Sequence, residues 1–310
     1  MQSSHWAKIG EAGFLSGMKL MFAIYHRLGR WPFRLVLYPV LAWYVLTNAI
    51  ARHASKDYLT RLHRASAGHT PPPTLANIYR HFTAFAEMML DKLLVWSGDL
   101  DRVIYAIENP GVLRDRMAAG QGAVIVTAHI GNAELCRVLA REKSSIRLNV
   151  LVHTPQAQRF NQLMRELNPA SQIDLIQVSD ISAATAMLLA ERVEAGEFVV
   201  IAGDRVPLSD SNAHASGIVE VDFLGAAAPL PFGPYLLASL FKCPLIGMIA
   251  CRRNNCFHIT LATLAERVVL PRQNRRAAAA EPAQAFAAMM AKECSTAPFQ
   301  WFNFFPFWTR

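Results

Sequence analysis

The chain has 310 residues, enough for one large core or two modest domains. Hydrophobic residues make up 53% and charged residues only 17%, with a mean hydropathy of +0.19. This composition excludes general disorder and favours contact with a lipid interface. Of the net charge of +8, residues 1–64 carry +7, from nine Lys or Arg against Glu11 and Asp57. Because the residues between these charges are strongly apolar, the segment favours anionic lipid over nucleic acid as its partner.

Residues 35–50, LVLYPVLAWYVLTNAI, form an uncharged run of 16 residues. A helix that spans a bilayer needs about 20 apolar residues, and Pro39 interrupts this run. Basic residues bracket it on both sides, at Arg34 and Arg52. We expect an interfacial or shallowly inserted anchor, and the alternative is an ordinary buried helix.

The run Gly68–Pro73 (GHTPPP) is the clearest break in the chain. We therefore expect an N-terminal membrane-associated helical module over residues 1–73 and a second domain over residues 74–310. The second domain should begin with a helix over residues 74–96, because Ile78, Phe82 and Phe85 recur at helical spacing.

From residue 120 onward, short apolar runs alternate with helical patterns. We expect strands at 122–128, 147–152, 173–178, 197–202, 219–224, 244–250 and 257–264. Helices are expected at about 131–142, 155–167, 181–195 and 233–241, and Arg252–Asn255 should form a hairpin turn. Continuous apolar strands that alternate with helices predict an α/β fold with a mixed, largely parallel sheet flanked by helices.

The first of these strands ends at an H-x4-E pattern formed by His129 and Glu134. Ligand sites in α/β sheets gather beyond the carboxyl ends of strands. On a regular helix the two side chains would lie about 140° apart, so His129 should sit in the turn, eased by Gly131, and Glu134 in the first helical turns. The predicted chemistry is general-base catalysis, in which Glu134 orients the imidazole and His129 takes a hydroxyl proton. A helix-capping histidine is the alternative.

Sequence patterns of other enzyme classes are missing. The chain contains no G-x-S-x-G elbow, no G-x4-G-K-[ST] loop and no G-x-G-x-x-G loop. Its five cysteines are scattered, and the spacing of Cys251, Cys256 and His258 matches no common zinc site. We therefore expect neither a metal nor a cofactor.

Several stretches resemble one protein family. TAHIGNAELC resembles the H-x4-D/E motif of the lysophospholipid acyltransferase superfamily, in particular its lipid A lauroyl/myristoyl acyltransferase branch. GEFVVIAGDRVPLS, FLGAAAPLPFGPYLLASLFKCPL and APFQWFNFFPFW are also similar to that family. The N-terminal stretch IGEAGFLSGMKLMFAIYHRLGRWPFRLVLYPV resembles a subgroup found in aryl-polyene pigment clusters. The similarity extends over nearly the whole chain.

The resemblance implies transfer of a fatty acyl group from an acyl-carrier-protein or coenzyme A thioester to a hydroxyl of a membrane lipid or glycolipid. It also implies catalysis by His129 and Glu134 without a metal, on the cytoplasmic face of the inner membrane. Two alternatives stay open: a non-catalytic, membrane-docked lipid-binding protein, and a phospholipid or ornithine-lipid acyltransferase.

Candidate substrate contacts follow from the same resemblance. By analogy, Arg205 would hold a phosphate or the thioester oxygen, and Asp204 would orient it; a structural salt bridge is the alternative. Where lipid A enzymes often have an arginine after the second strand, this chain reads LVHTP, so His153 is the candidate acceptor contact and lipid A cannot be assumed as the acceptor. Gly131 and Asn132, within the H-x4-E motif, are also predicted to contact substrate.

Two apolar stretches near the C-terminus have two interpretations each. The small residues 225–228 could form a wall along an extended acyl chain or a tight loop before the next helix. The aromatic segment 300–308 could pack on the domain or lie in the membrane interface.

Overall fold

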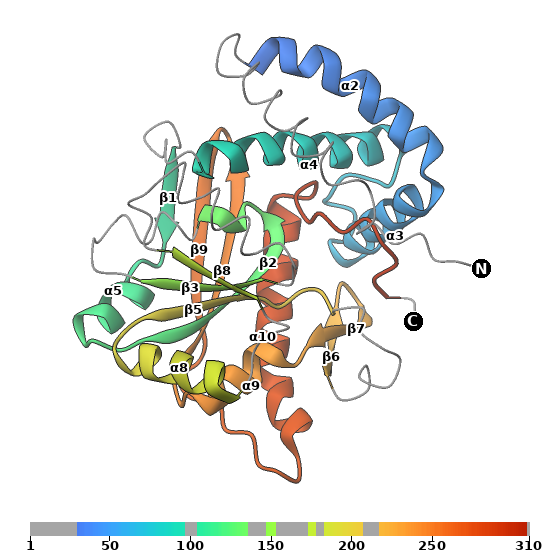
Figure 1. Ribbon diagram of the computed structural model, residues 1–310. Coiled ribbons are helices and arrows are strands. Elements are labelled where there is room, and N and C mark those ends of the chain that lie inside the picture. Colours follow the sequence, from blue (N-terminus) through green and yellow to red (C-terminus); the bar gives the residue numbers. More distant parts are fainter. Residues whose placement is uncertain are drawn as a thin grey trace. The chain divides into compact units, whose positions relative to one another are not determined.

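The computed structural model describes residues 30–96, 104–135, 147–152, 173–177, 183–206 and 217–308 (Figure 1). The chain divides into two compact units, Met1–Ala49 and Ile50–Arg310. This division falls after the first residue of α3 (Ala49–Ala65), whereas the sequence boundary was expected after residue 73. Almost all of α3 therefore belongs to the same unit as the sheet.

The described helix of the first unit is α2 (Arg30–Thr47), which contains Pro39. It exposes large apolar side chains along its length, at Trp31, Leu35, Val40, Trp43 and Leu46. Within the described ranges, no helix has both the length and the apolar character needed to cross a membrane. Trp43 is 70% exposed, and the expected interfacial anchor stays a prediction.

The second unit is built on a seven-stranded sheet with the strand order β1-β9-β8-β2-β5-β3-β4 (Figure 1). Every neighbouring pair is parallel except β8 and β9, which form a hairpin. A separate antiparallel pair comprises β6 and β7. The bounds are β1 Tyr105–Glu108, β2 Ala123–Gly131, β3 Leu148–Val152, β4 Ile173–Gln177, β5 Phe198–Ala202, β6 Ile218–Phe223, β7 Ala226–Pro231, β8 Leu245–Arg253 and β9 Cys256–Ala265. The predicted mixed, largely parallel α/β fold is confirmed.

Helices cover both faces of this sheet. On one face, Ile125 of β2 shares a core with Met88 of α4 and Leu113 of α5. On the other face, α10 approaches so closely that a Cβ at Gly247 of β8 would lie 2.6 Å from the sulfur of Met289. The helices of this unit, besides α3, are α4 Leu75–Trp96, α5 Gly111–Ala118, α8 Ala183–Glu194, α9 Gly233–Leu240 and α10 Arg275–Thr296.

Most expected elements are present, but some boundaries differ. The strand expected at 122–128 continues to Gly131, so His129 lies within β2 and not in a turn after it. The helix expected from 131 begins as a short 3₁₀ helix, η3 (Ala133–Leu135), and its remainder lies outside the described residues. The helix expected at 155–167 lies outside them as well. Residues 226–231 are a strand, which corrects the interpretation of this stretch as a loop.

The aromatic segment at the C-terminus packs against the second unit. Trp301 is 1% exposed and makes edge-to-face ring contacts with Tyr58 of α3 and Phe223 of β6. Phe304 stacks on Phe82 of α4 at a centroid distance of 4.4 Å. Of the two expectations for this segment, packing on the domain is confirmed.

A buried histidine ties this segment to the helices. The Nε2 of His81 lies 2.7 Å from the carbonyl oxygen of Trp301, and its Nδ1 lies 2.9 Å from the Ser55 hydroxyl. Because a carbonyl only accepts hydrogen bonds, Nε2 carries the proton, and Nδ1 accepts one from Ser55. Burial lowers the pKa of His81 to about 4, against a weaker opposing effect of the Trp301 carbonyl. His81 is therefore neutral at physiological pH.

We expect this histidine to make the fold sensitive to acid. The folded-state pKa of about 4 lies below the unfolded value of 6.5, so the unfolded chain binds more protons between these values. Stability is then fully present above pH 6.5 and is lost as pH falls toward 4, by about 3 kcal/mol in total. Denaturant unfolding at pH 7.5 and pH 5 would measure this loss of stability. In His81→Gln, which cannot titrate, this part of the pH dependence should vanish, and an unchanged pH dependence would contradict the assignment.

Candidate active site

The site forms where β2 and β5 end side by side. The two strands are parallel neighbours, with Thr127 opposite Ala202. His129 and Asp204 each stand two residues beyond that pair, so both side chains emerge at the same carboxyl edge of the sheet. There, His129 Nδ1 lies 2.8 Å from Asp204 Oδ1, and the backbone N–H of His129 donates to Oδ2 at 2.9 Å. Two residues that are 75 positions apart in the sequence thus form one hydrogen-bonded pair.

Asp204 is fully buried and receives a third hydrogen bond, from Trp301 Nε1 to Oδ2 at 3.2 Å. Burial by itself raises the pKa of this carboxyl, but the interactions with His129 and Arg205 outweigh it and lower the pKa to about 2. The carboxylate is therefore ionised and only accepts hydrogen bonds, which places a proton on His129 Nδ1. Nε2 is then the ring nitrogen that can act as a base, on a side chain that is 36% exposed.

Gly131 keeps the end of β2 close to β8. Its φ is +63°, and a Cβ at this position would lie 2.0 Å from the carbonyl oxygen of Ala250. The next residue, Asn132, donates its backbone N–H to that same oxygen at 2.8 Å. Only glycine fits here, because both the positive φ and the close approach exclude a side chain.

Asn132 and Glu134 lie directly after this glycine. The buried Asn132 accepts a hydrogen bond on Oδ1 from the backbone N–H of Glu134 at 3.2 Å, which starts η3. Its Nδ2 is a buried donor that has no hydrogen-bond partner in the described structure. His129 Nδ1 is bonded to Asp204, so it is Asp204 that holds this ring nitrogen. A direct role of Glu134 at His129 stays a prediction.

Arg205 is held by the C-terminal segment. Its Nη2 donates to the carbonyl oxygen of Phe302 at 2.6 Å, and its guanidinium carbon lies 5.6 Å from the centroid of the Phe305 ring. Burial lowers the pKa of Arg205, with Asp204 opposing this effect. Its Nε is a second buried donor without a hydrogen-bond partner among the described residues. Arg205 and Asn132 thus each bring a donor to the site region that could bind a substrate oxygen.

Two other histidines were considered in the sequence. His153 falls outside the described residues. His258 bonds Glu108 at 3.0 Å, and the described ranges contain no group of three or more His, Cys, Asp or Glu side chains that could hold a metal ion.

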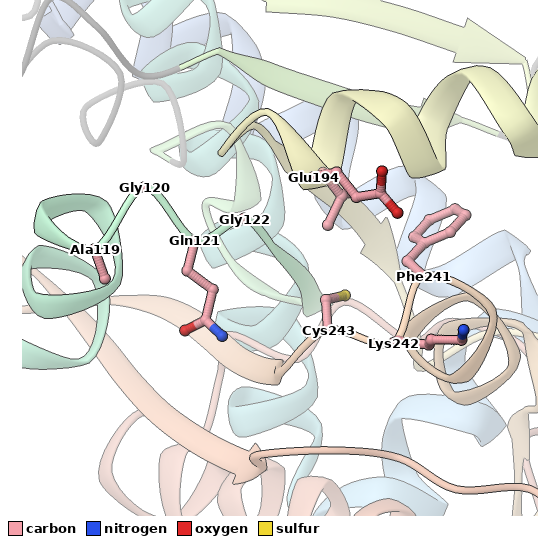
Figure 2. Close-up of a pocket in the computed structure, with 9 residues that line it drawn as sticks. Ala119, Gly120, Gln121, Gly122, Glu194, Phe241, Lys242 and Cys243 are labelled. Atoms are coloured by element: carbon pink, nitrogen blue, oxygen red, sulfur yellow. The ribbon is translucent and has the colours of Figure 1, made fainter.

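A surface groove of about 440 Å³ has a lining that includes Gln121, Glu194, Lys242 and Cys243, whose side chains are drawn in Figure 2. Gln121 and Cys243 precede β2 and β8, so the groove lies at the amino ends of these strands, opposite His129. Burial raises the pKa of the Cys243 thiol to about 11, which keeps it protonated and poorly nucleophilic. The groove is therefore separate from the site at the carboxyl edge.

Comparison with known proteins assigns the family. A model of the bacterial lipid A biosynthesis acyltransferase family matches residues 77–310, a range that includes His129, Glu134, Asp204 and Trp301. No curated protein matches the chain. The family match runs from α4 through the whole sheet to the aromatic C-terminus. The chain belongs to the bacterial lipid A biosynthesis acyltransferase family and is an acyltransferase.

Proposed function

We propose that the protein transfers a fatty acyl group from a carrier thioester to a hydroxyl of a membrane lipid or glycolipid. His129, held by Asp204, is the general base that takes the hydroxyl proton. The observation that carries this proposal is the pair of hydrogen bonds between the two residues, which places a proton on Nδ1 and makes Nε2 the ring nitrogen that would accept the hydroxyl proton. The acceptor hydroxyl gives its proton to Nε2 while its oxygen bonds to the thioester carbon. The carrier thiolate then leaves and takes the proton back from the imidazolium.

The remaining candidate residues have roles around this step. Arg205 and Asn132 offer buried donors that could stabilise the negative oxygen that develops on the thioester carbonyl, or bind an acceptor phosphate. Gly131 lets the end of β2 lie close to β8. Glu134 would add negative charge near the imidazolium, and His153 would contact the acceptor. Mass spectrometry of lipids from deletion and complemented strains would identify the acceptor as lipid A, a pigment lipid or another lipid.

The proposed donor is an acyl-carrier-protein thioester. Carrier proteins are acidic, and the chain carries a net charge of +8, so electrostatic attraction should steer the encounter. We expect kcat/KM to be higher with the carrier-protein thioester than with the coenzyme A thioester, and to fall as ionic strength rises. Acyl transfer from both donors at low and high salt would test this. A higher kcat/KM with coenzyme A, insensitive to salt, would contradict it.

The proposed location is the cytoplasmic face of the inner membrane, where α2 and the basic residues around it would bind an anionic surface. Burying an apolar side chain in the interface stabilises binding by about 1.5–3 kcal/mol. Replacing both Trp43 and Leu46, which are 70% and 64% exposed, with glutamate should therefore weaken binding to anionic vesicles at least about tenfold. Vesicle co-sedimentation of the full chain would measure the change.

A matched control is available on a different surface. Met187 of α8 is 66% exposed, so Met187→Glu removes a comparable exposed apolar group outside α2. We expect this variant to bind vesicles like the wild type. If the α2 variant also bound like the wild type, the anchoring role of α2 would be wrong.

A further inference from the structure

The indole of Trp301 contacts the carboxylate that orients His129. Its Nε1 donates to Asp204 Oδ2, the oxygen that also accepts the backbone N–H of His129. Trp301 is 1% exposed and Asp204 is fully buried, so bulk water does not reach this contact to replace the hydrogen bond from the indole. With two donors fixing Oδ2, the other oxygen, Oδ1, is left facing His129 Nδ1.

The backbone on either side of Trp301 is bonded to the end of β2. Gly131 donates its N–H to the carbonyl oxygen of Gln300 at 2.8 Å, and Phe302 donates to the carbonyl oxygen of His129 at 2.9 Å. These bonds form an antiparallel bridge between Ile130 and Trp301. The C-terminal segment thus runs beside the strand that carries His129, and the indole is placed in register with it.

The carbonyl of Trp301 is fixed as well. It accepts the hydrogen bond from His81 Nε2, whose Nδ1 in turn accepts from Ser55. The ring of Trp301 is also enclosed by Tyr58 and Phe223 at centroid distances of 5.0 Å and 5.1 Å. Both the backbone and the ring of Trp301 are therefore constrained independently of Asp204.

We propose that Trp301 is a positioning residue for acyl transfer, whose indole N–H holds the Asp204 carboxylate in the orientation that fixes the His129 imidazole. This inference rests on the proposed function, in which His129 is the base. Without the indole donor, Oδ2 keeps only the backbone N–H of His129, so the orientation of the carboxylate is less tightly fixed. The remaining charge is then less dispersed, so Asp204 becomes more basic and the imidazolium of His129 becomes more favoured.

The titratable groups around Asp204 decide whether another ionisation could change the charge near it. His129 approaches from β2 and Arg205 follows it in the chain. Cys294 of α10 interacts with Asp204, and burial raises the pKa of this thiol to about 12. Burial also raises the pKa of Tyr58, the hydrogen-bond partner of Cys294, well above 10. Both groups stay neutral near neutral pH, so neither changes the charge around Asp204 there.

A matched pair of variants tests the proposal. Trp301→Phe removes the indole N–H that bonds Asp204. Trp308→Phe makes the same change in the same aromatic cluster, 5.6 Å away between centroids, where Nε1 is buried and has no hydrogen-bond partner in the described structure. We expect kcat to fall about tenfold in Trp301→Phe with KM within about twofold, and both constants to stay within about twofold in Trp308→Phe. Equal losses in the two variants would show that only packing matters and would overturn the proposal.

A second readout does not depend on turnover. In protein with ¹⁵N-labelled histidine, NMR titration of the His129 ring should give a higher pKa in Trp301→Phe than in the wild type, and an unchanged pKa in Trp308→Phe. If Trp301→Phe is poorly folded, the benzothienyl analogue of tryptophan at position 301 keeps the ring volume without the N–H and should give the same rise. An unchanged His129 pKa in a folded variant overturns the proposal. Normal activity of a folded His129→Ala would instead refute the proposed function, while the titration would still decide whether Trp301 acts on His129.

Discussion

Replacing His129 with alanine is expected to lower kcat about 10²–10⁴-fold. A lipid hydroxyl holds its proton too tightly to ionise near neutral pH, and a positioned base contributes about this much to its transfer. In the structure, the buried Asp204 carboxylate orients the Nδ1 atom of His129 at the carboxyl edge of the sheet. The measurement is steady-state acyl transfer from a labelled carrier thioester to membrane lipid.

A second imidazole–carboxylate pair provides the control. His258 bonds Glu108 at 3.0 Å on β9 and β1, and β8 separates β9 from the strand that carries His129. His258→Ala should retain acyl transfer within a few-fold of the wild type. If folded His129→Ala transferred acyl groups as fast as His258→Ala, His129 would be a structural residue and the proposed mechanism would be wrong.

Asp204→Asn is expected to lower kcat about 10²-fold or more while leaving the fold intact. The amide oxygen can still accept the N–H groups of His129 and Trp301 at the Oδ2 position. Its NH₂ then faces His129 Nδ1, so Nδ1 becomes the acceptor and Nε2 carries the proton. An imidazole in this tautomer cannot take a proton from the substrate through Nε2. The asparagine side chain also lacks the negative charge with which Asp204 stabilises the imidazolium.

The matched change is Glu108→Gln, which alters the carboxylate of the His258 pair in the same way. Acyl transfer should be nearly unchanged in Glu108→Gln, and thermal unfolding should show both variants folded. If Asp204→Asn kept wild-type kcat, the hydrogen bonds between Asp204 and His129 would have no role in catalysis.

Much of the fold could be predicted because apolar strands alternate with helical patterns. The strands around GAVIVTA and EFVVIA were located to within a few residues. Elements with weak patterns were missed. Tyr105–Glu108 is only four residues long, and α10 is rich in alanine with Pro282 inside, so its two faces differ little in hydrophobicity. In β7, Pro229 and Pro231 suggested a loop, but a two-stranded pair has free edges that tolerate proline.

The site was predicted in part. His129 was identified from the end of its strand, and Asp204 from the end of another strand, yet their pairing was not expected. The H-x4-E spacing directed attention to Glu134, which is near in sequence, whereas Asp204 is brought to His129 by the pairing of β2 with β5. Strand order is set by tertiary packing, which local patterns do not encode. The contact of Trp301 with Asp204 has no sequence pattern at all, because it depends on how the C-terminal segment packs beside β2.

The pH dependence of kcat/KM in the wild type and in His129→Ala tests the central claim most directly, because it shows whether the base is this imidazole. If His129 must be neutral to accept the hydroxyl proton, kcat/KM of the wild type should rise with pH through one ionisation and then level off. In His129→Ala the residual kcat/KM should be low and should lack this rise over the same pH range. A variant that keeps the wild-type pH profile would show that another group is the base.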